Sequence, residues 1–262
     1  MLVRLVAPER IAAISHYSHD ANATSIPLEV ARRFRATTGT AEEVVAMRPD
    51  LVLASSFTPP STRAAFERAG LRTLFLDSPT TVAASRAQVA EVAAALGAPE
   101  RGREITAGID RALAHSASQR RPGPSYRTVA GPGDPSATRI TTGPRPAPGN
   151  GEDEPSALLF IAGDLANGSG TLLDELLSRA GFANAAARYG LRHTGTLPAE
   201  LIVSDPPDVI LAPDPGGRVA AMRERLLPGT PVATFPRALV NCGGPSIAPA
   251  LRRLRAIRAS LA

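Results

Sequence analysis

The clearest pattern of hydrophobic and polar positions occurs twice along the chain. Residues 41–54 and 199–212 align without a gap, and seven aligned positions are identical, including a central Pro-Asp pair. In each copy, apolar residues at helical spacing precede this pair and an uninterrupted aliphatic run follows it. Such a run, without alternating polar positions, is typical of a parallel strand covered on both faces.

Each copy therefore predicts a short helix, a Pro-Asp turn and a buried strand. Proline fixes φ and ends the helix, and the aspartate can accept hydrogen bonds from backbone amides of the turn. Thr40 and Glu43 open the first copy with the spacing of a capping box. Two copies so far apart predict two similar α/β lobes, because a solenoid would repeat at short, regular intervals.

The first lobe supplies one predicted wall of a binding site. Its strands are predicted at residues 10–14, 51–54 and 71–76. Ligands of open parallel sheets bind beyond the carboxyl ends of the strands, so the polar loops 15–20, 55–58 and 77–79 form this wall. The candidate ligand-binding residues are His16, Tyr17, Ser18, His19, Ser55, Ser56, Phe57, Asp77 and Ser78.

The second lobe supplies the opposite wall. Its strands are predicted at 157–162, 209–212 and 232–235, and its helices at 172–180 and 247–261. The second wall consists of the loops 163–170, 190–194, 214–217 and 241–244. Its candidate residues are Arg192, His193, Asp214, Asn241 and Cys242. The first of these loops is rich in glycine but lacks the pattern of a phosphate-binding loop, so we expect Ser169 or Thr171 to cap the next helix.

The predicted fold class is α/β, with two Rossmann-like lobes of parallel sheets, a single long connecting helix and a ligand cleft between the lobes. The predicted domains are an N-terminal lobe at 1–98, a connecting helix at 99–119, a disordered insertion at 120–155 and a C-terminal lobe at 156–262. The insertion is dominated by Pro, Gly, Ser, Thr and Arg. Such a composition cannot bury enough apolar surface to order itself.

Composition excludes some functions. The chain has 29 basic and 24 acidic residues, a net charge of +5, and no Trp. The basic residues are all Arg and are scattered, which argues against nucleic-acid binding. No run approaches the roughly 20 apolar residues of a membrane span. The chain opens on the end of a helix, which in an α/β lobe should follow a strand. We therefore expect a truncated N-terminus that lacks a first strand and an export signal.

Two groups of residues have side chains that could take part in metal binding or catalysis. His16 and His19, with Asp20 and either His193 or Cys242, could hold a metal, and His16, Tyr17 or His19 could ligate heme iron. No close set of histidines and carboxylates supports such a site, so surface histidines, no resident metal and no cofactor are predicted. Cys242 could act as a nucleophile with His193, but a small residue in a tight corner explains it as well. No catalytic set is evident, so the chain is not predicted to be an enzyme.

Several blocks of the sequence resemble one family. They are residues 10–15, 39–54 and 170–184, and the stretch from 197–200 through 207–211. In this order the chain resembles the substrate-binding proteins of ABC transporters that serve vitamin B12, ferric siderophores and heme. The resemblance covers most of the chain except 120–155.

The resemblance implies a function. A protein of this family captures its ligand between two lobes in the periplasm, and an acidic residue on each lobe docks onto the permease. The matching positions are Glu42 and Glu200, which the internal repeat makes equivalent. The implied partners are a metal chelate and an ABC permease dimer in the inner membrane, and we expect a monomer.

The identity of the chelate stays open among cobalamin, ferric siderophore and heme. Because Trp is absent, Tyr17, Phe57 and the pair Arg192-His193 remain for stacking or anion pairing. One alternative is a cytosolic α/β enzyme that uses His16, His19 and Cys242. A second is a truncated product without function.

Overall fold

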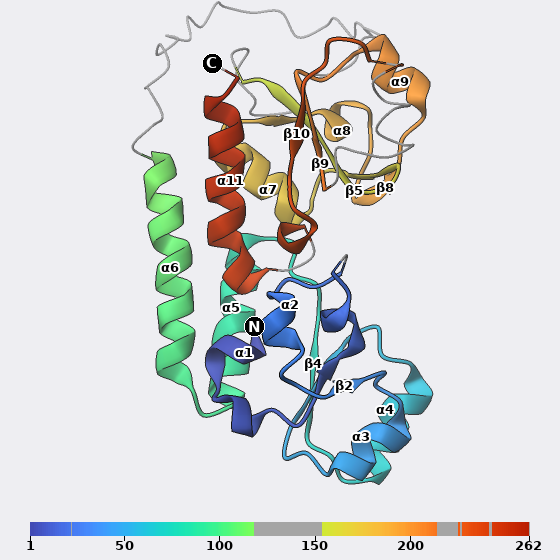
Figure 1. Ribbon diagram of the computed structural model, residues 1–262, viewed down its shortest axis with the longest axis vertical. Helices are drawn as coiled ribbons and strands as arrows, with labels where there is room; N and C mark the ends of the chain where they lie inside the picture. Colours follow the sequence, from blue (N-terminus) through green and yellow to red (C-terminus); the bar gives the residue numbers. More distant parts are fainter. Residues whose placement is uncertain (22, 118–153, 214–224, 226, 241–242, 262) are drawn as a thin grey trace, which may run out of the picture.

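The computed structural model describes residues 1–21, 23–117, 154–213, 225, 227–240 and 243–261. These residues form two α/β lobes, one above the other along the long axis of the molecule (Figure 1). Helices α6 (Pro99–Ala117) and α11 (Ile247–Ala259) lie together on one side. The predicted mixed α/β fold of two lobes is confirmed.

The N-terminal lobe contains two small parallel sheets. Its elements are α1 (Leu2–Leu5), η1 (Pro8–Arg10), β1 (Ile14–Ser15), η2 (His16–His19), α2 (Leu28–Ala31), β2 (Ala36–Thr37), α3 (Ala41–Met47), β3 (Val52–Ser55), α4 (Pro60–Arg68) and β4 (Thr73–Leu76). Strand β1 pairs with β2, and β3 pairs with β4. The two pairs are separate sheets among the described residues.

The C-terminal lobe contains one larger sheet. Its elements are β5 (Ser156–Ala162), β6 (Leu165–Asn167), α7 (Leu172–Arg179), β7 (Ala183–Asn184), α8 (Ala185–Arg188), β8 (Thr194–Thr196), α9 (Ala199–Ser204), β9 (Val209–Ala212), β10 (Val232–Thr234), η3 (Arg237–Leu239) and η4 (Gly244–Ser246). The strand order is β10-β9-β5-β6-β8, and β7 also pairs with β5. Strands β10, β9, β5 and β7 pair in parallel, whereas β6 and β8 are antiparallel additions.

Both copies of the repeat fold as a helix, a Pro-Asp turn and a strand, as the sequence predicts. The copies are α3 with β3 and α9 with β9. The equivalent residues Val44 and Ile202 are buried, at 7% and 8% exposure, and anchor their helices to the lobes. The strands differ in burial. All four residues of β9 are at most 1% exposed, whereas none of the four in β3 is buried.

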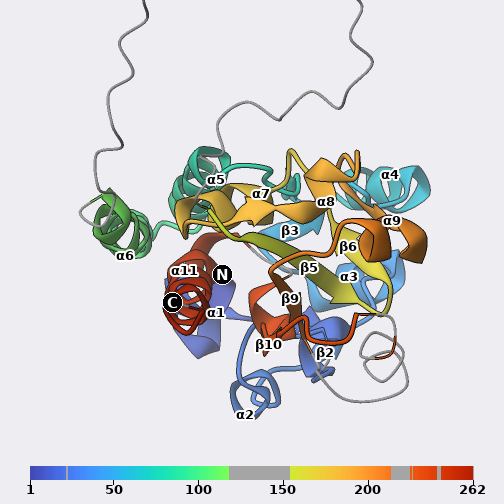
Figure 2. The same ribbon diagram turned by 90° about the horizontal axis from the view of Figure 1, so that it is seen from above.

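Helix α5 (Val82–Ala95) joins the cores of the two lobes. Its first residue, Val82, belongs to the large core of the C-terminal lobe, and Val92 packs with Leu5 in the N-terminal lobe. The backbone N–H of Val82 donates to the Glu175 carboxylate of α7 over 2.7 Å. Helix α5 therefore packs against both lobes. Helix α6 also contributes to the contact between the lobes, because it packs against both α5 and α11 (Figure 2).

Three local predictions need correction. The strand predicted at 10–14 is mostly absent: Arg10 ends the turn η1, which Pro8 begins, residues 11–13 belong to no regular element, and only Ile14 belongs to β1. The loop predicted at 163–170 contains β6, which folds back on β5. Thr40 does cap α3, but the Glu43 carboxylate accepts hydrogen bonds from Thr37 and Thr38 instead of closing a capping box. These bonds, first that from the Thr37 hydroxyl, lower the pKa of Glu43.

No helix in the described part of the chain is both long and apolar enough to cross a membrane.

Candidate functional site

The loop after β1 presents an aromatic pair. The rings of His16 and Tyr17 lie 4.1 Å apart, and the Tyr17 side chain is 64% exposed. His16 Nδ1 lies 3.4 Å from the carbonyl oxygen of Thr37, and His19 Nε2 lies 2.9 Å from that of Ala31. These contacts fix the two imidazoles to neighbouring segments of the lobe and leave the Tyr17 ring accessible.

The loops after β3 and β4 lie side by side because these strands are parallel neighbours. Ser56 N–H donates to the carbonyl oxygen of Leu76 over 2.9 Å. The Arg63 guanidinium lies 4.3 Å from the centre of the Phe75 ring and donates to the carbonyl oxygens of Ser56 and Thr58. Phe57 lies on this anchored loop, and its side chain is 81% exposed to solvent.

The loop 77–79 turns toward the junction of the lobes. The Asp77 carbonyl oxygen accepts a hydrogen bond from the side chain of Gln88, and Asp77 and Ser78 are exposed. Gly243 of the C-terminal lobe lies so close to Pro79 and Ser85 that a side chain at position 243 would collide with both. The first predicted wall therefore reaches the second at this point.

The loops 163–170 and 190–194 are brought together as predicted. Gly168 N–H donates to the carbonyl oxygen of His193 over 2.6 Å, Ser169 N–H to that of Leu191, and His193 N–H back to that of Ser169. A Cβ atom at Gly168 would collide with the backbone oxygens of Leu191 and His193, so glycine is required there. Arg192 and His193 are exposed beyond this junction.

A buried polar network that the sequence did not reveal supports these loops. Asn167 is 2% exposed and Asn184 7% exposed. The Thr171 hydroxyl donates to Asn167 Oδ1, Asn184 Nδ2 donates to Asp174 Oδ1, and Thr171 caps α7 by accepting from Asp174 N–H. Scattered asparagines carry no pattern that marks them as buried, so only their side-chain contacts identify them.

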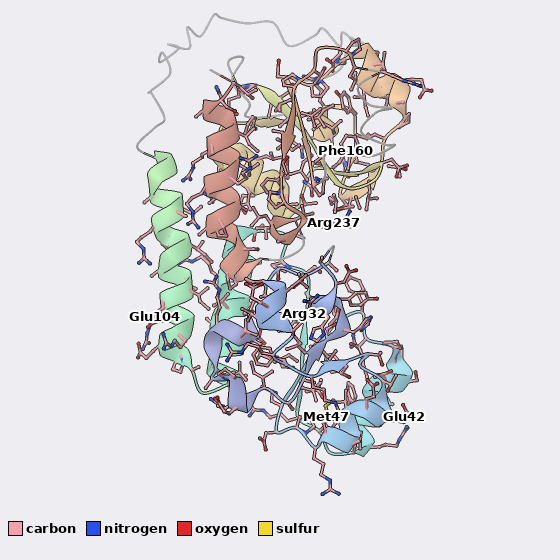
Figure 3. All side chains as sticks on the ribbon, viewed as in Figure 1. Arg32, Glu42, Met47, Glu104, Phe160 and Arg237 are labelled. Atoms are coloured by element: carbon pink, nitrogen blue, oxygen red, sulfur yellow. The ribbon has the colours of Figure 1, made fainter. Side chains whose placement is uncertain are left out.

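The lobes also enclose a cavity of about 320 Å³ between α1 and α2 on one side and η3, η4 and α11 on the other. Its lining includes Arg4, Ile26, Val30, Leu239 and Gly243. Figure 3 shows Arg32 and Arg237 on the edges where the two lobes face each other. The lining of this cavity is therefore mostly apolar, with Arg4 as its basic residue.

Three candidate residues, Asp214, Asn241 and Cys242, lie outside the described residues, as does most of the predicted insertion at 120–155. Among the residues that the structure describes, no group of three or more His, Cys, Asp or Glu side chains is placed to hold a metal ion. Within the described ranges, His16 and His19 belong to no such group.

Glu42 and Glu200 occupy the first turns of α3 and α9, and both are exposed. Glu42 is labelled on the outer side of α3 in Figure 3. In both ribbon views α3 and α9 lie on the side of the molecule away from α6 and α11 (Figures 1 and 2).

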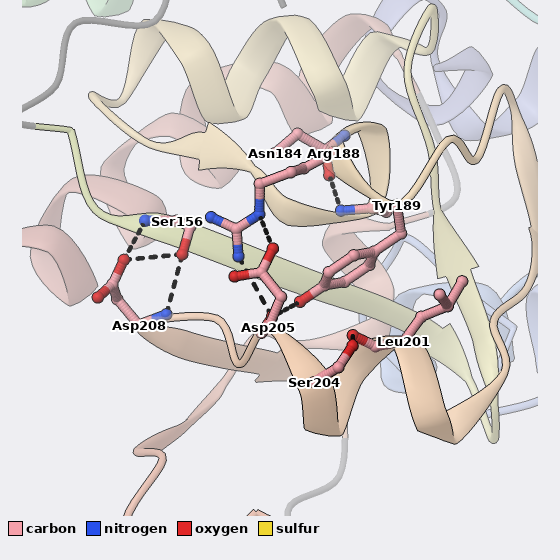
Figure 4. A network of polar contacts seen from close by, with 9 residues as sticks. Ser156, Asn184, Arg188, Tyr189, Leu201, Ser204, Asp205 and Asp208 are labelled. Carbon is pink, nitrogen blue, oxygen red and sulfur yellow. Dashed lines mark hydrogen bonds and ion pairs between the residues drawn. The ribbon is translucent and has the colours of Figure 1, made fainter. Parts of the chain in front are cut away.

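A polar network fixes the turn of the second repeat copy (Figure 4). The Asp208 carboxylate accepts hydrogen bonds from the backbone N–H and the hydroxyl of Ser156, both over 2.7 Å. These bonds, first that of the backbone N–H, lower the pKa of Asp208. Beside them, Arg188 pairs with the Asp205 carboxylate at 2.6 Å. The network ties the start of β9 to the start of β5.

Comparisons with known proteins agree with this architecture. Residues 1–123 match the family model described as periplasmic binding protein. The periplasmic heme-binding protein BhuT in complex with two hemes is 24% identical, with a TM-score of 0.65 over 89% of this chain and 85% of that chain. No curated protein sequence matches the chain.

Two Vibrio cholerae structures are also similar. The periplasmic heme-binding protein HutB is 14% identical, with a TM-score of 0.69 over 98% of this chain and 93% of that chain. The periplasmic vitamin B12-binding protein BtuF is likewise 14% identical, with a TM-score of 0.64 over 95% and 88%.

The chain therefore has the fold of the periplasmic binding proteins. The resemblance drawn from the sequence, to the substrate-binding proteins for vitamin B12, iron chelates and heme, is confirmed. The matched family consists of binding proteins, which supports a substrate-binding role.

Proposed function

We propose that the chain is the substrate-binding component of an ABC importer, which captures a metal chelate in the periplasm and delivers it to a permease dimer. The proposal includes the division into lobes at 1–98 and 156–262 with a connecting helix at 99–119. It is supported by the family match of the N-terminal half and by the fold.

The observation that carries the proposal is the pair of exposed rings, Tyr17 and Phe57. Both stand on loops that follow strands of the N-terminal lobe, and both rings are mostly exposed. Exposed aromatic rings on the loops of a predicted binding site are suited to stacking on a ligand. A flat chelate can stack on such rings, which an extended polar ligand cannot do as well.

The C-terminal lobe offers complementary groups. The loop 168–170 leads into α7, and α7 reaches the N-terminal lobe through Glu175. The segment 191–193 is bonded to this loop through the backbone, and we therefore propose that Arg192 and His193 belong to the wall of the cleft. Arg192 suits a carboxylate of the ligand, and an imidazole or a phenolate suits iron.

Within the class of metal chelates, heme fits these groups best. It combines a flat apolar ring system, carboxylates and an iron that Tyr17, His16 or His193 can ligate. Cobalamin and ferric siderophores are the other members of the class. The remaining proposed contacts are Ser18, His19, Ser55, Ser56, Asp77, Ser78, Asp214, Asn241 and Cys242.

For delivery, Glu42 and Glu200 are proposed to dock onto the permease. The repeat places a second matched pair beside them, because Val45 and Val203 are 36% and 45% exposed. Two equivalent surfaces, each with one carboxylate and one aliphatic side chain, suit a partner that is itself a symmetric dimer.

The test is an absorbance titration of the purified chain with ferric heme, cyanocobalamin and a ferric siderophore. We expect saturable one-to-one binding of heme, and Tyr17→Phe should change the spectrum or weaken affinity at least tenfold. The control is Tyr189→Phe, because the Tyr189 hydroxyl donates to the carbonyl oxygen of Asp205 outside the proposed site. Saturable binding of none of the three chelates by the folded chain would refute the proposal.

A further inference from the structure

The carboxylate of Glu43 lies at the centre of a polar contact between helix α3 and strand β2. Its Oε2 atom accepts hydrogen bonds from the Thr37 hydroxyl over 2.7 Å, the Thr38 backbone N–H over 2.8 Å and the Thr38 hydroxyl over 2.9 Å. These bonds lower the pKa of Glu43, so the acceptor is a charged carboxylate at neutral pH. Hydrogen bonds to a charged acceptor are about twice as strong as neutral ones. Glu43 therefore holds the end of β2 against the first turn of α3.

The segment that Glu43 holds also supports the aromatic pair of the candidate site. Thr37 stands opposite Ser15 in the pairing of β2 with β1, and Ser15 directly precedes His16. The carbonyl oxygen of Thr37 lies 3.4 Å from His16 Nδ1, and the ring of His16 lies 4.1 Å from that of Tyr17. A displacement of Thr37 would therefore reach the Tyr17 ring through one backbone carbonyl and one imidazole.

The second copy of the repeat shows that this carboxylate is not needed to build the helix, the Pro-Asp turn and the strand. The position equivalent to Glu43 is Leu201, which is 41% exposed. Helix α9 begins without a side-chain cap, yet α9 and β9 follow each other as α3 and β3 do. The contact with residues 37–38 is therefore particular to the N-terminal lobe, which carries the exposed rings of Tyr17 and Phe57.

We propose that Glu43 is a positioning residue for ligand binding, because it holds the segment 37–38 and thereby keeps His16 and Tyr17 in the orientation that receives the chelate. Glu43 directly follows Glu42, so it lies between the proposed docking surface and this wall of the proposed site. The role of Glu43 toward a chelate rests on the proposed function, whereas its effect on the Tyr17 ring does not.

Nuclear magnetic resonance of the full chain with labelled tyrosines tests the effect on the Tyr17 ring without any ligand. The chain contains three tyrosines, so few ring signals need to be assigned. Glu43→Leu introduces the residue of the second copy and should shift the Tyr17 signal. Glu43→Gln should shift it less, because an amide oxygen remains as an acceptor. The Tyr189 signal should not move, and neither signal should move in Glu67→Gln, at an exposed position of α4.

A titration then tests the role of Glu43 in binding, with whichever of ferric heme, cyanocobalamin and a ferric siderophore the wild type retains. Glu43→Leu should weaken affinity about three- to tenfold, the equivalent of one lost hydrogen bond, mainly through faster dissociation. In a Tyr17→Ala background the same substitution should leave the residual affinity unchanged, because the ring that Glu43 positions is absent. A merely structural role would lower affinity in both backgrounds.

Two results would overturn the proposal. The first is an unchanged Tyr17 signal in Glu43→Leu, or an equal shift of the Tyr17 and Tyr189 signals, which would indicate a general change of the fold. The second is an equal loss of affinity from Glu43→Leu in the wild-type and Tyr17→Ala backgrounds. If the wild type binds none of the three chelates, the proposed function fails, and the Tyr17 signal still decides whether Glu43 positions this ring.

Discussion

Replacing Asp208 by alanine and, separately, Asp50 by alanine tests what the repeat means for stability. Both aspartates follow a proline and precede a buried or partly buried strand, so they are equivalent in sequence. Only Asp208 accepts two hydrogen bonds, both from Ser156 over 2.7 Å. The prediction is therefore a difference between two substitutions that look alike in the sequence.

The expected loss of stability depends on Ser156, whose hydrogen-bond acceptor the substitution Asp208→Ala removes. Ser156 is 4% exposed, so its backbone N–H loses its acceptor in a place that water reaches poorly. An unsatisfied buried group costs about 1–3 kcal/mol. Because the Asp208 carboxylate itself is largely solvated, we expect the low half of that range, about 1–2 kcal/mol, for Asp208→Ala. Asp50→Ala should stay within about 0.5 kcal/mol, like other surface substitutions.

The assay is urea unfolding of the wild type and both variants, followed by circular dichroism at several pH values. The lowered pKa of Asp208 sets the sign of the pH dependence. The carboxylate contributes its stability above the unfolded-state pKa of about 4, and this contribution is lost as the pH falls through the lower folded-state pKa. The gap between wild type and Asp208→Ala should therefore narrow below about pH 4. Equal losses for the two variants at neutral pH would refute the reasoning.

Three further predictions concern docking, the loops and the junction of the lobes. Glu42→Arg together with Glu200→Arg should leave chelate affinity nearly unchanged and abolish uptake in reconstituted vesicles. The control is Glu91→Arg at another exposed position. Lost chelate affinity with intact uptake would contradict the docking role of the two glutamates. Gly168→Ala should weaken chelate binding and lower stability by about 1–3 kcal/mol in thermal unfolding, because its Cβ meets two backbone oxygens. Gly108→Ala, in the open middle of α6, should not lower stability, and equal effects of the two would contradict the loop assignment. Glu175→Ala should speed hydrogen exchange of the Val82 amide by about tenfold, because it removes the hydrogen bond between α5 and α7. Unchanged exchange would show that this hydrogen bond does not stabilise the contact between the lobes.

The sequence predicts most regular elements because their patterns are local. The repeat predicts α3, β3, α9 and β9. Thr40 caps α3 and Thr171 caps α7, and both caps follow from local spacing. The strand β6 was missed because three residues in a glycine-rich loop carry no recognisable period. Its pairing with β5 and β8 arises from contacts across the lobe, which the local pattern does not contain.

The sequence predicts which loops form the candidate site, but it does not predict the contacts that their side chains make. Parallel strands place their carboxyl ends at one edge, so the joining of 55–58 with 77–79 follows from the strand pattern. The stacking of His16 on Tyr17 and the burial of Asn167 and Asn184 depend on side-chain packing between distant segments.

Native mass spectrometry of the purified chain tests the central claim most directly. The chain is mixed separately with heme, cyanocobalamin, several ferric siderophores, metal-free porphyrin and free ferric ion. The account predicts one-to-one retention of a single class of metal chelate by the folded chain, and no retention of the free metal ion. A folded chain that retains none of the chelates, or that binds only the free ion, would contradict it.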